Sequence, residues 1–134
     1  MPSVDLNYMA IVAAAVVNMV VGAVWYSPAL FAKQWAALTG RKMNEMGNGA
    51  QGYVLTAIGA LVQAWILSHI VSYAGADTAV KGAMVGFWLW VGFVAITQGV
   101  NMVFAGTRKK LWAINTGYFL VVLLINGGLL AVWR

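Results

Sequence analysis

Seven of the polar side chains within the apolar runs of this sequence form a candidate polar cluster, and their chemistry limits what the cluster can do. Six are amides and one is a threonine: Asn18, Gln63, Thr97, Gln98, Asn101, Asn115 and Asn126. Carboxamides donate and accept hydrogen bonds but do not titrate, so they can bind a solute or join helices but are poor acids or bases. The set therefore predicts either hydrogen bonds between helices or a polar path for a small neutral or cationic solute.

His69 is the only histidine, and its side chain is of the one type that titrates near neutral pH. Trp65 and Tyr73 lie four residues to either side, so the three share one face of a helix. A metal site needs further ligands, and only Asp5 and Asp77 are expected on the same side. We predict a hydrogen-bonded interfacial histidine, without metal or cofactor; a ligand-binding or pH-sensing role is the alternative.

Catalytic motifs are absent from the sequence. The chain has three acidic residues, all outside the apolar runs, and no cysteine. It contains no Ser–His–Asp arrangement, no HExxH zinc motif, no phosphate-binding loop and no dinucleotide-binding fingerprint. These absences predict that the protein is not an enzyme. A lipid-modifying enzyme built around His69 is a third reading, for which no second catalytic group is visible.

The composition excludes an ordinary soluble domain. Hydrophobic residues make up 63% of the 134 residues, and charged residues only 8%. Soluble domains carry about 25% charged residues, so most of this surface must face lipid or other apolar chains. The net charge of +5 does not indicate a nucleic-acid partner, because the basic residues flank apolar segments instead of lining one face.

Four uncharged segments are long enough to cross a bilayer: 8–26, 53–73, 83–104 and 111–133. A helix needs about 20 residues to cross a hydrocarbon core of about 30 Å. Each segment carries a face of small or amide residues, which lets helices pack closely. We therefore predict an all-α membrane protein, a single four-helix transmembrane domain whose small faces meet inside a left-handed bundle.

The basic residues indicate which ends of the spans face the cytoplasm. The connectors after the first and third spans hold six basic residues, whereas the other side holds two, Lys81 and Arg134. Basic loops are retained in the cytoplasm, so both termini are predicted outside. The six residues predicted inside are Lys33, Arg41, Lys42, Arg108, Lys109 and Lys110.

The connector after the first span predicts a short helix over about residues 28–39. Ser27 is a good N-cap, Pro28 suits the first helical position, and Gly40 is a typical stop. Aromatic side chains and one lysine give this helix an amphipathic pattern, so we expect it to lie in the cytoplasmic interface. The alternative is a lid over a pocket between the spans. The residues concerned are Trp25, Tyr26, Ser27, Pro28, Phe31, Lys33 and Trp35.

The third span is predicted to be central. On a continuous helix, Thr97, Gln98 and Asn101 share one face, and a seam of small residues that includes Ala95 and Gly99 lies nearly opposite. Such a helix can contact neighbours on two sides. We accordingly expect a cluster of amides in the middle and inner part of the bilayer, formed by Asn18, Gln98, Asn101 and Asn115.

The abundance of small residues favours association with other membrane helices. The chain has 15 glycines, and Gly82 with Gly86 forms one GxxxG pattern. Four short helices with so many small faces can form more than one interface. The leading hypothesis is a non-enzymatic subunit, partnered by the lipid bilayer and by other copies or another membrane protein. The alternative is a passive transporter or channel for a small solute.

Two strings resemble a known family. "WYSPALFAKQW" (residues 25–35) and "LWAINTGY" (residues 111–118), in a four-helix layout, are similar to the domain-of-unknown-function 1761 family of small prokaryotic membrane proteins. The resemblance covers essentially the whole chain. It implies this fold and a place in a prokaryotic inner membrane, but no reaction.

The chain departs from that family pattern at three positions. The resemblance would place Gly at Ala32, an acidic residue at Ala105 and His at Phe119. The last two departures remove groups that titrate. A mechanism that used that carboxylate or that imidazole is therefore not available to this chain.

Overall fold

The protein is built from helices joined by short connections. A computed structural model describes residues 4–40 and 49–133. The helices are α1 (Tyr8–Trp25), α2 (Ala32–Thr39), α3 (Gly49–Tyr73), α4 (Ala79–Leu89), α5 (Ile96–Ala105) and α6 (Lys109–Val132), and a π-helical segment (Trp90–Ala95) joins α4 to α5. Within these described residues, four helical stretches are long and apolar enough to cross a membrane: 8–25, 50–73, 79–105 and 109–132. The predicted fold class, an all-α multi-pass membrane protein, is confirmed.

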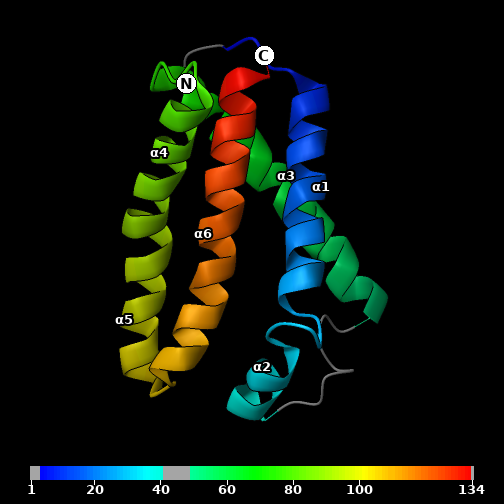
Figure 1. Ribbon diagram of the computed structural model, residues 1–134, viewed down its shortest axis with the longest axis vertical. Helices are drawn as coiled ribbons and strands as arrows, with labels where there is room; N and C mark the ends of the chain where they lie inside the picture. Colours follow the sequence, from blue (N-terminus) through cyan, green and yellow to red (C-terminus); the bar gives the residue numbers. More distant parts are fainter. Residues whose placement is uncertain (1–3, 41–48, 134) are drawn as a thin grey trace.

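α6 is the centre of the arrangement. It packs against α4 on one side and against α1 and α3 on the other, whereas α4 meets α3 only briefly. Figure 1 shows α2 and the α5–α6 turn at one end, which we call the basic end because Lys33 and residues 108–110 lie there. The described chain begins and ends at the other end, called the terminal end.

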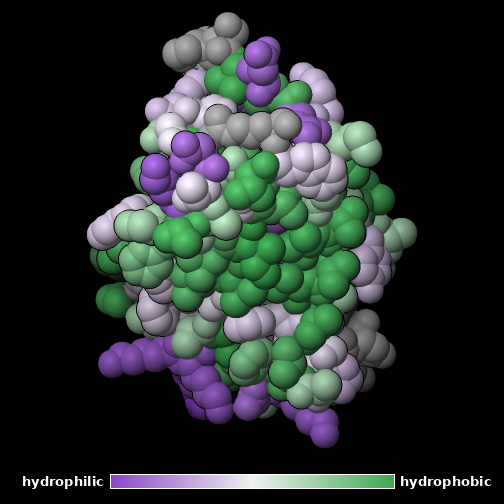
Figure 2. Space-filling model, turned by 45° about the horizontal axis from the view of Figure 1, so that its top comes forward, coloured by the Kyte–Doolittle hydropathy of each residue, from purple (hydrophilic) through white to green (hydrophobic). Residues whose placement is uncertain are grey.

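The surface is apolar across the middle and hydrophilic toward the ends, as Figure 2 shows. Large side chains are fully open to the surroundings, including Phe93 (74% exposed) and Phe104 (87% exposed). At the terminal end, Lys81 forms an exposed ion pair with Asp77, with 3.3 Å between nitrogen and oxygen. A surface of this kind suits lipid with headgroups at both ends.

The tightest helix contact joins α4 to α6 through glycines. A Cβ built at Gly82 would collide with the carbonyl oxygen of Gly127 and lie 2.6 Å from the Cβ of Ala131. One turn along, a Cβ at Gly86 would collide with the carbonyl group of Leu123. The predicted GxxxG pattern is therefore used within the chain, to bring two backbones together.

The prediction that the third span is central is wrong. The residues of this span that face inward are Gly86, Trp90, Ala95 and Gly99. Neighbours in this series are four residues apart, except Trp90 and Ala95, which are five apart, whereas a regular helix would keep a spacing of three or four. That step of five residues is the π-helical segment, where the amide of Ile96 donates to the carbonyl of Val91. The extra residue rotates everything after it, which turns residues 97 and 101 away from α6.

The predicted start of the short helix is also wrong. Ser27 is not an N-cap of α2, because its hydroxyl donates back to the carbonyl of Val24 at 2.7 Å. Residues 26–31 form turns, and the amide of Phe31 donates to the carbonyl of Trp25 at 3.1 Å. The helix begins at Ala32 and ends, as predicted, before Gly40, whose φ is +74°. Pro28 lies in the turn.

Candidate functional site

A cavity of about 800 Å³ lies between α1, α3 and α6 in the half of the molecule near the basic end. α3 crosses α1 and leaves α6 toward this end (Figure 1), so the three helices diverge around it. Among the described residues, no charged side chain lines the cavity. Its lining is Asn18, Met19, Gly22, Ala23, Tyr26, Ser27, Pro28, Gly52, Tyr53, Thr56, Gly59, Ala60, Gln63, Tyr118 and Phe119.

Three polar side chains from three helices form a directed chain at the deep end of this cavity. The Tyr118 hydroxyl donates to Asn18 Oδ1, and Asn18 Nδ2 donates to Gln63 Oε1 at 3.0 Å. Asn18 and Tyr118 are 5% and 8% exposed, so these bonds satisfy groups that would be costly to bury unpaired. We call these residues the Asn18–Gln63–Tyr118 chain.

The two strings that carry the family resemblance meet beside the cavity. Trp25 Nε1 donates to the carbonyl of Ile114 at 2.8 Å, and the Tyr26 hydroxyl donates to Asn115 Oδ1 at 2.8 Å. Gly117 leaves room for Trp25, because a Cβ there would lie 3.0 Å from the indole. The end of α1 is therefore fastened to α6.

Removing the Tyr26 hydroxyl should destabilise this junction. Tyr26→Phe leaves Asn115 Oδ1 without its donor, and we expect a loss of about 1 kcal/mol in the free energy of unfolding. Tyr53→Phe is the matched control, because Tyr53 lines the same cavity but is 65% exposed. Unfolding in mixed micelles measures both. Equal losses in the two variants would contradict the assigned hydrogen bond.

The predicted amide cluster forms only in part. Asn18 and Gln63 meet, and Asn115 lies one turn of α6 from Tyr118, whose ring centroid is 5.7 Å from that of Tyr26. The amides of the third span stay apart for the reason given above: Thr97 and Asn101 are exposed and Gln98 is half-buried.

Asn126 lies elsewhere in α6, in the packed half of the bundle near the terminal end. Its Nδ2 donates to the carbonyl of Ala14 at 3.0 Å, and it is 2% exposed. Its Oδ1 is the one buried side-chain oxygen or nitrogen without a partner among the described residues. Asn126 therefore joins α6 to α1 and does not belong to the cavity.

The segment that was predicted to be an anchor or a lid lies at one end of the cavity. Ser27 and Pro28 line the cavity directly, and the Phe31 ring lies 4.8 Å from that of Trp25, centroid to centroid. Trp35 is half-buried and Lys33 is exposed. α2 also packs against α6. Of the basic residues predicted inside, Arg41 and Lys42 lie outside the described residues.

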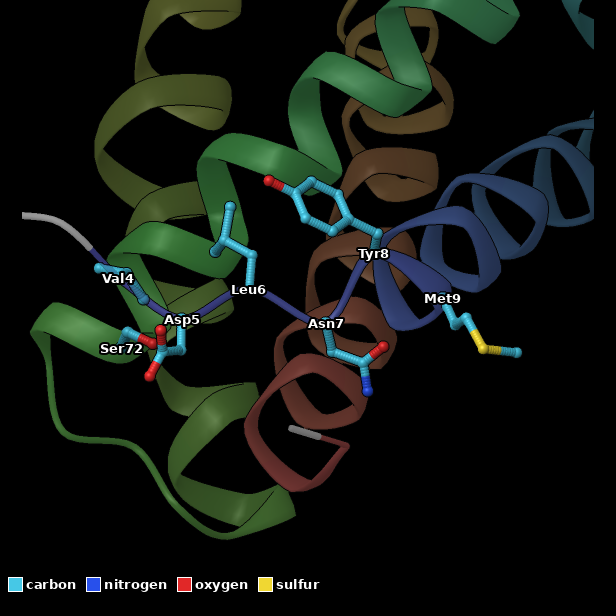
Figure 3. Close-up of a pocket in the computed structure, with 7 residues that line it drawn as sticks. All are labelled: Val4, Asp5, Leu6, Asn7, Tyr8, Met9 and Ser72. Carbon is cyan, nitrogen blue, oxygen red and sulfur yellow. The ribbon is translucent and has the colours of Figure 1, made fainter.

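His69 stands apart from the cavity, in the terminal half of α3. It is 8% exposed, its Nδ1 lies 2.8 Å from the carbonyl oxygen of Trp65, and its ring contacts those of Trp65 and Tyr73. The predicted shared aromatic face is thus present. A separate depression of about 670 Å³ lies at the same end, where residues 4–9 pass Ser72 (Figure 3).

Tyr118 is the site residue that the sequence did not single out. A phenol in the middle of an apolar span needs a hydrogen-bond partner, and Tyr118 lies three residues from Asn115 and four from Val122, so the three share one face of a helix. That spacing was the available signal. Phe119, where the family resemblance implied histidine, lines the same cavity.

Comparison with known proteins places most of the chain in one family. Residues 9–131 match the family described as "Protein of unknown function (DUF1761)". No curated protein and no solved structure matches the chain.

Proposed function

Because this chain belongs to the DUF1761 family, whose description assigns no reaction, we propose a non-enzymatic role as a subunit of a membrane oligomer or larger membrane complex. The observation that supports this proposal best is the packing of the third span, which contacts α6 along one side and leaves its other side open. Thr97 and Asn101 are exposed on that open side, and neither side chain has a hydrogen-bond partner among the described residues. Polar side chains within a membrane span usually face protein.

The open side of α5 supports self-association. Thr97 lies about 12 Å from the end of the helix at 1.5 Å per residue, well inside the hydrocarbon layer. A carboxamide both donates and accepts, so Asn101 side chains of two copies related by a twofold axis can satisfy each other. A second copy of this chain therefore fits the polar side of α5 without further requirements.

Self-association is testable by cross-linking, because the chain has no cysteine of its own. Asn101→Cys should form a disulfide-linked dimer in membranes under mild oxidation. Val62→Cys, at a position of α3 that is 54% exposed, is the control and should stay uncrosslinked. A single-chain mass in mild detergent, with no second protein bound and no dimer from Asn101→Cys, contradicts the proposed role.

We further propose a place in a prokaryotic inner membrane with the basic end in the cytoplasm and both termini outside. The exposed basic residues of the basic end, Lys33 and residues 108–110, support this orientation. In whole cells, a membrane-impermeant maleimide should label Lys81→Cys directly and Lys33→Cys only after permeabilisation. The reverse pattern would show that the orientation is inverted.

Passive transport of a small solute is the second candidate, and the cavity is what favours it. The cavity reaches Asn18 and Gln63, but within one turn of them Ala14, Ala64 and Leu67 are buried in the packed core. Solute passage would therefore require these helices to separate. Gln63→Leu should abolish solute flux into liposomes if this candidate is correct, and unchanged flux would exclude the path.

A further inference from the structure

The Asn18–Gln63–Tyr118 chain has a direction that leaves one donor free at the cavity. The Tyr118 hydroxyl and one Asn18 N–H are used as donors, and Gln63 Oε1 is used as an acceptor. The amide nitrogen of Gln63 has no partner among the described residues, and Gln63 lines the cavity. A ligand that enters the deep end therefore meets an N–H donor, and its best partner is a carbonyl oxygen.

The other walls of the cavity favour a flat, uncharged body. Four aromatic rings line it, from Tyr26, Tyr53, Tyr118 and Phe119. Gly59 borders open space, since a Cβ there would meet nothing within 4 Å. Among the described residues that line the cavity, none carries a charge that would hold a phosphate or a carboxylate. Aromatic rings stack well on planar ligands.

The depth of Gln63 in the membrane decides whether a lipid ester or a membrane-dissolved ring compound supplies the carbonyl oxygen. Gln63 lies ten residues along α3 from Tyr53, which is about 15 Å at 1.5 Å per residue. The ester carbonyls of a bilayer lipid stay near the headgroups, whereas Gln63 lies near the middle of a hydrocarbon core of about 30 Å. A carbonyl carried on a membrane-dissolved ring reaches this depth.

From this geometry we propose that the cavity binds an uncharged, ring-bearing carbonyl compound dissolved in the membrane, of the quinone class. One ring carbonyl accepts from Gln63 Nε2, the ring lies among the aromatic side chains, and the apolar tail leaves between α1 and α3 into lipid. The ligand is bound and not converted, which rests on the proposed non-enzymatic function. Its binding does not depend on whether the chain self-associates.

Equilibrium binding of decyl-benzoquinone to the full-length protein in lipid nanodiscs tests this proposal. Empty nanodiscs measure the quinone that merely partitions into lipid. We expect saturable binding of one quinone per chain, weakened about tenfold by Gln63→Leu, which corresponds to about 1.4 kcal/mol for the lost hydrogen bond. Gln98→Leu makes the same substitution outside the cavity and should leave the affinity unchanged.

Gly59→Phe supplies a second variant that leaves the Asn18–Gln63–Tyr118 chain intact. It should abolish quinone binding by filling the cavity, while the unfolding transition stays that of the unmodified protein. Quinone uptake equal to that of empty nanodiscs overturns the proposal, as does equal affinity in the Gln63→Leu and Gln98→Leu variants. Native mass spectrometry that finds a phospholipid held in the cavity and not displaced by quinone also overturns it. The Asn101→Cys cross-link reports on the proposed subunit role separately, so the two failures are distinguishable.

Discussion

Gly82→Ala should cause the largest loss of stability, although it adds a single methyl group. The new Cβ would collide with the carbonyl oxygen of Gly127, and the other atom in its way is the Cβ of Ala131. Neither atom belongs to a flexible side chain, so α4 and α6 must separate along their tightest contact. Overpacking typically costs about 1–3 kcal/mol, and backbone displacement places this case at the upper end. Thermal unfolding in mild detergent measures the loss.

Gly92→Ala is the matched control for this substitution. Gly92 lies in the same span, and a Cβ there would meet nothing within 4 Å. The variant should therefore unfold within a few degrees of the unmodified protein. If Gly82→Ala were as stable as Gly92→Ala, the close approach of α4 to α6 would be wrong.

Asn18→Leu should cause the second-largest loss, about 1–2 kcal/mol, because it removes a hydrogen-bond partner from Gln63 and another from Tyr118. Gln63 Oε1 loses its donor, and the Tyr118 hydroxyl keeps only the main-chain carbonyl of Asn18, at 3.2 Å, as an acceptor. Hydrogen bonds between membrane helices contribute only about 0.6 kcal/mol on average, so most of the expected loss comes from Gln63 Oε1, which is left unpaired. Asn101→Leu repeats the substitution at an exposed position and, in micelles dilute enough to keep two copies apart, should change the stability by less than about 0.5 kcal/mol.

A double-mutant cycle identifies the cause of that loss. Tyr118→Phe removes the hydroxyl that donates to Asn18 Oδ1, so the double variant should be about 0.5–1 kcal/mol more stable than the sum of the two single losses predicts. Unfolding in dilute mixed micelles gives all four values. Strict additivity would show that Asn18 and Tyr118 do not interact.

The spans could be predicted from the sequence because length and lack of charge are local properties. The predicted span 8–26 and the observed helix Tyr8–Trp25 differ by one residue. The faces could be predicted only where the helix is regular. In the third span, no feature of "WVGFVA" (Trp90–Ala95) predicts the extra residue of a π-helical turn. That one residue was enough to turn Asn101 from the interior to the surface.

The site was harder to predict than the spans because it depends on how helices cross. The stripe of Gly52, Thr56, Gly59 and Gln63 was visible on the second span, and all four residues line the cavity. Which partners they meet depends on the divergence of α3 from α6, which no spacing within one helix encodes. Ser27 shows the same limit, since its hydroxyl closes the helix before it and not the one after it.

The central claim is that a cavity opens between α1, α3 and α6 at the basic end, and cysteine reactivity along α3 tests it most directly. Thr56 and Gly59 line the cavity, whereas Ile58 and Val62 face outward, at 53% and 54% exposure. A thiol reacts as its thiolate, which forms in a wet cavity and not in lipid. With a water-soluble thiol reagent, cysteines at Thr56 and Gly59 should react at least about tenfold faster than cysteines at Ile58 and Val62. Equal rates at all four positions, or faster reaction at Ile58 and Val62, would contradict the cavity.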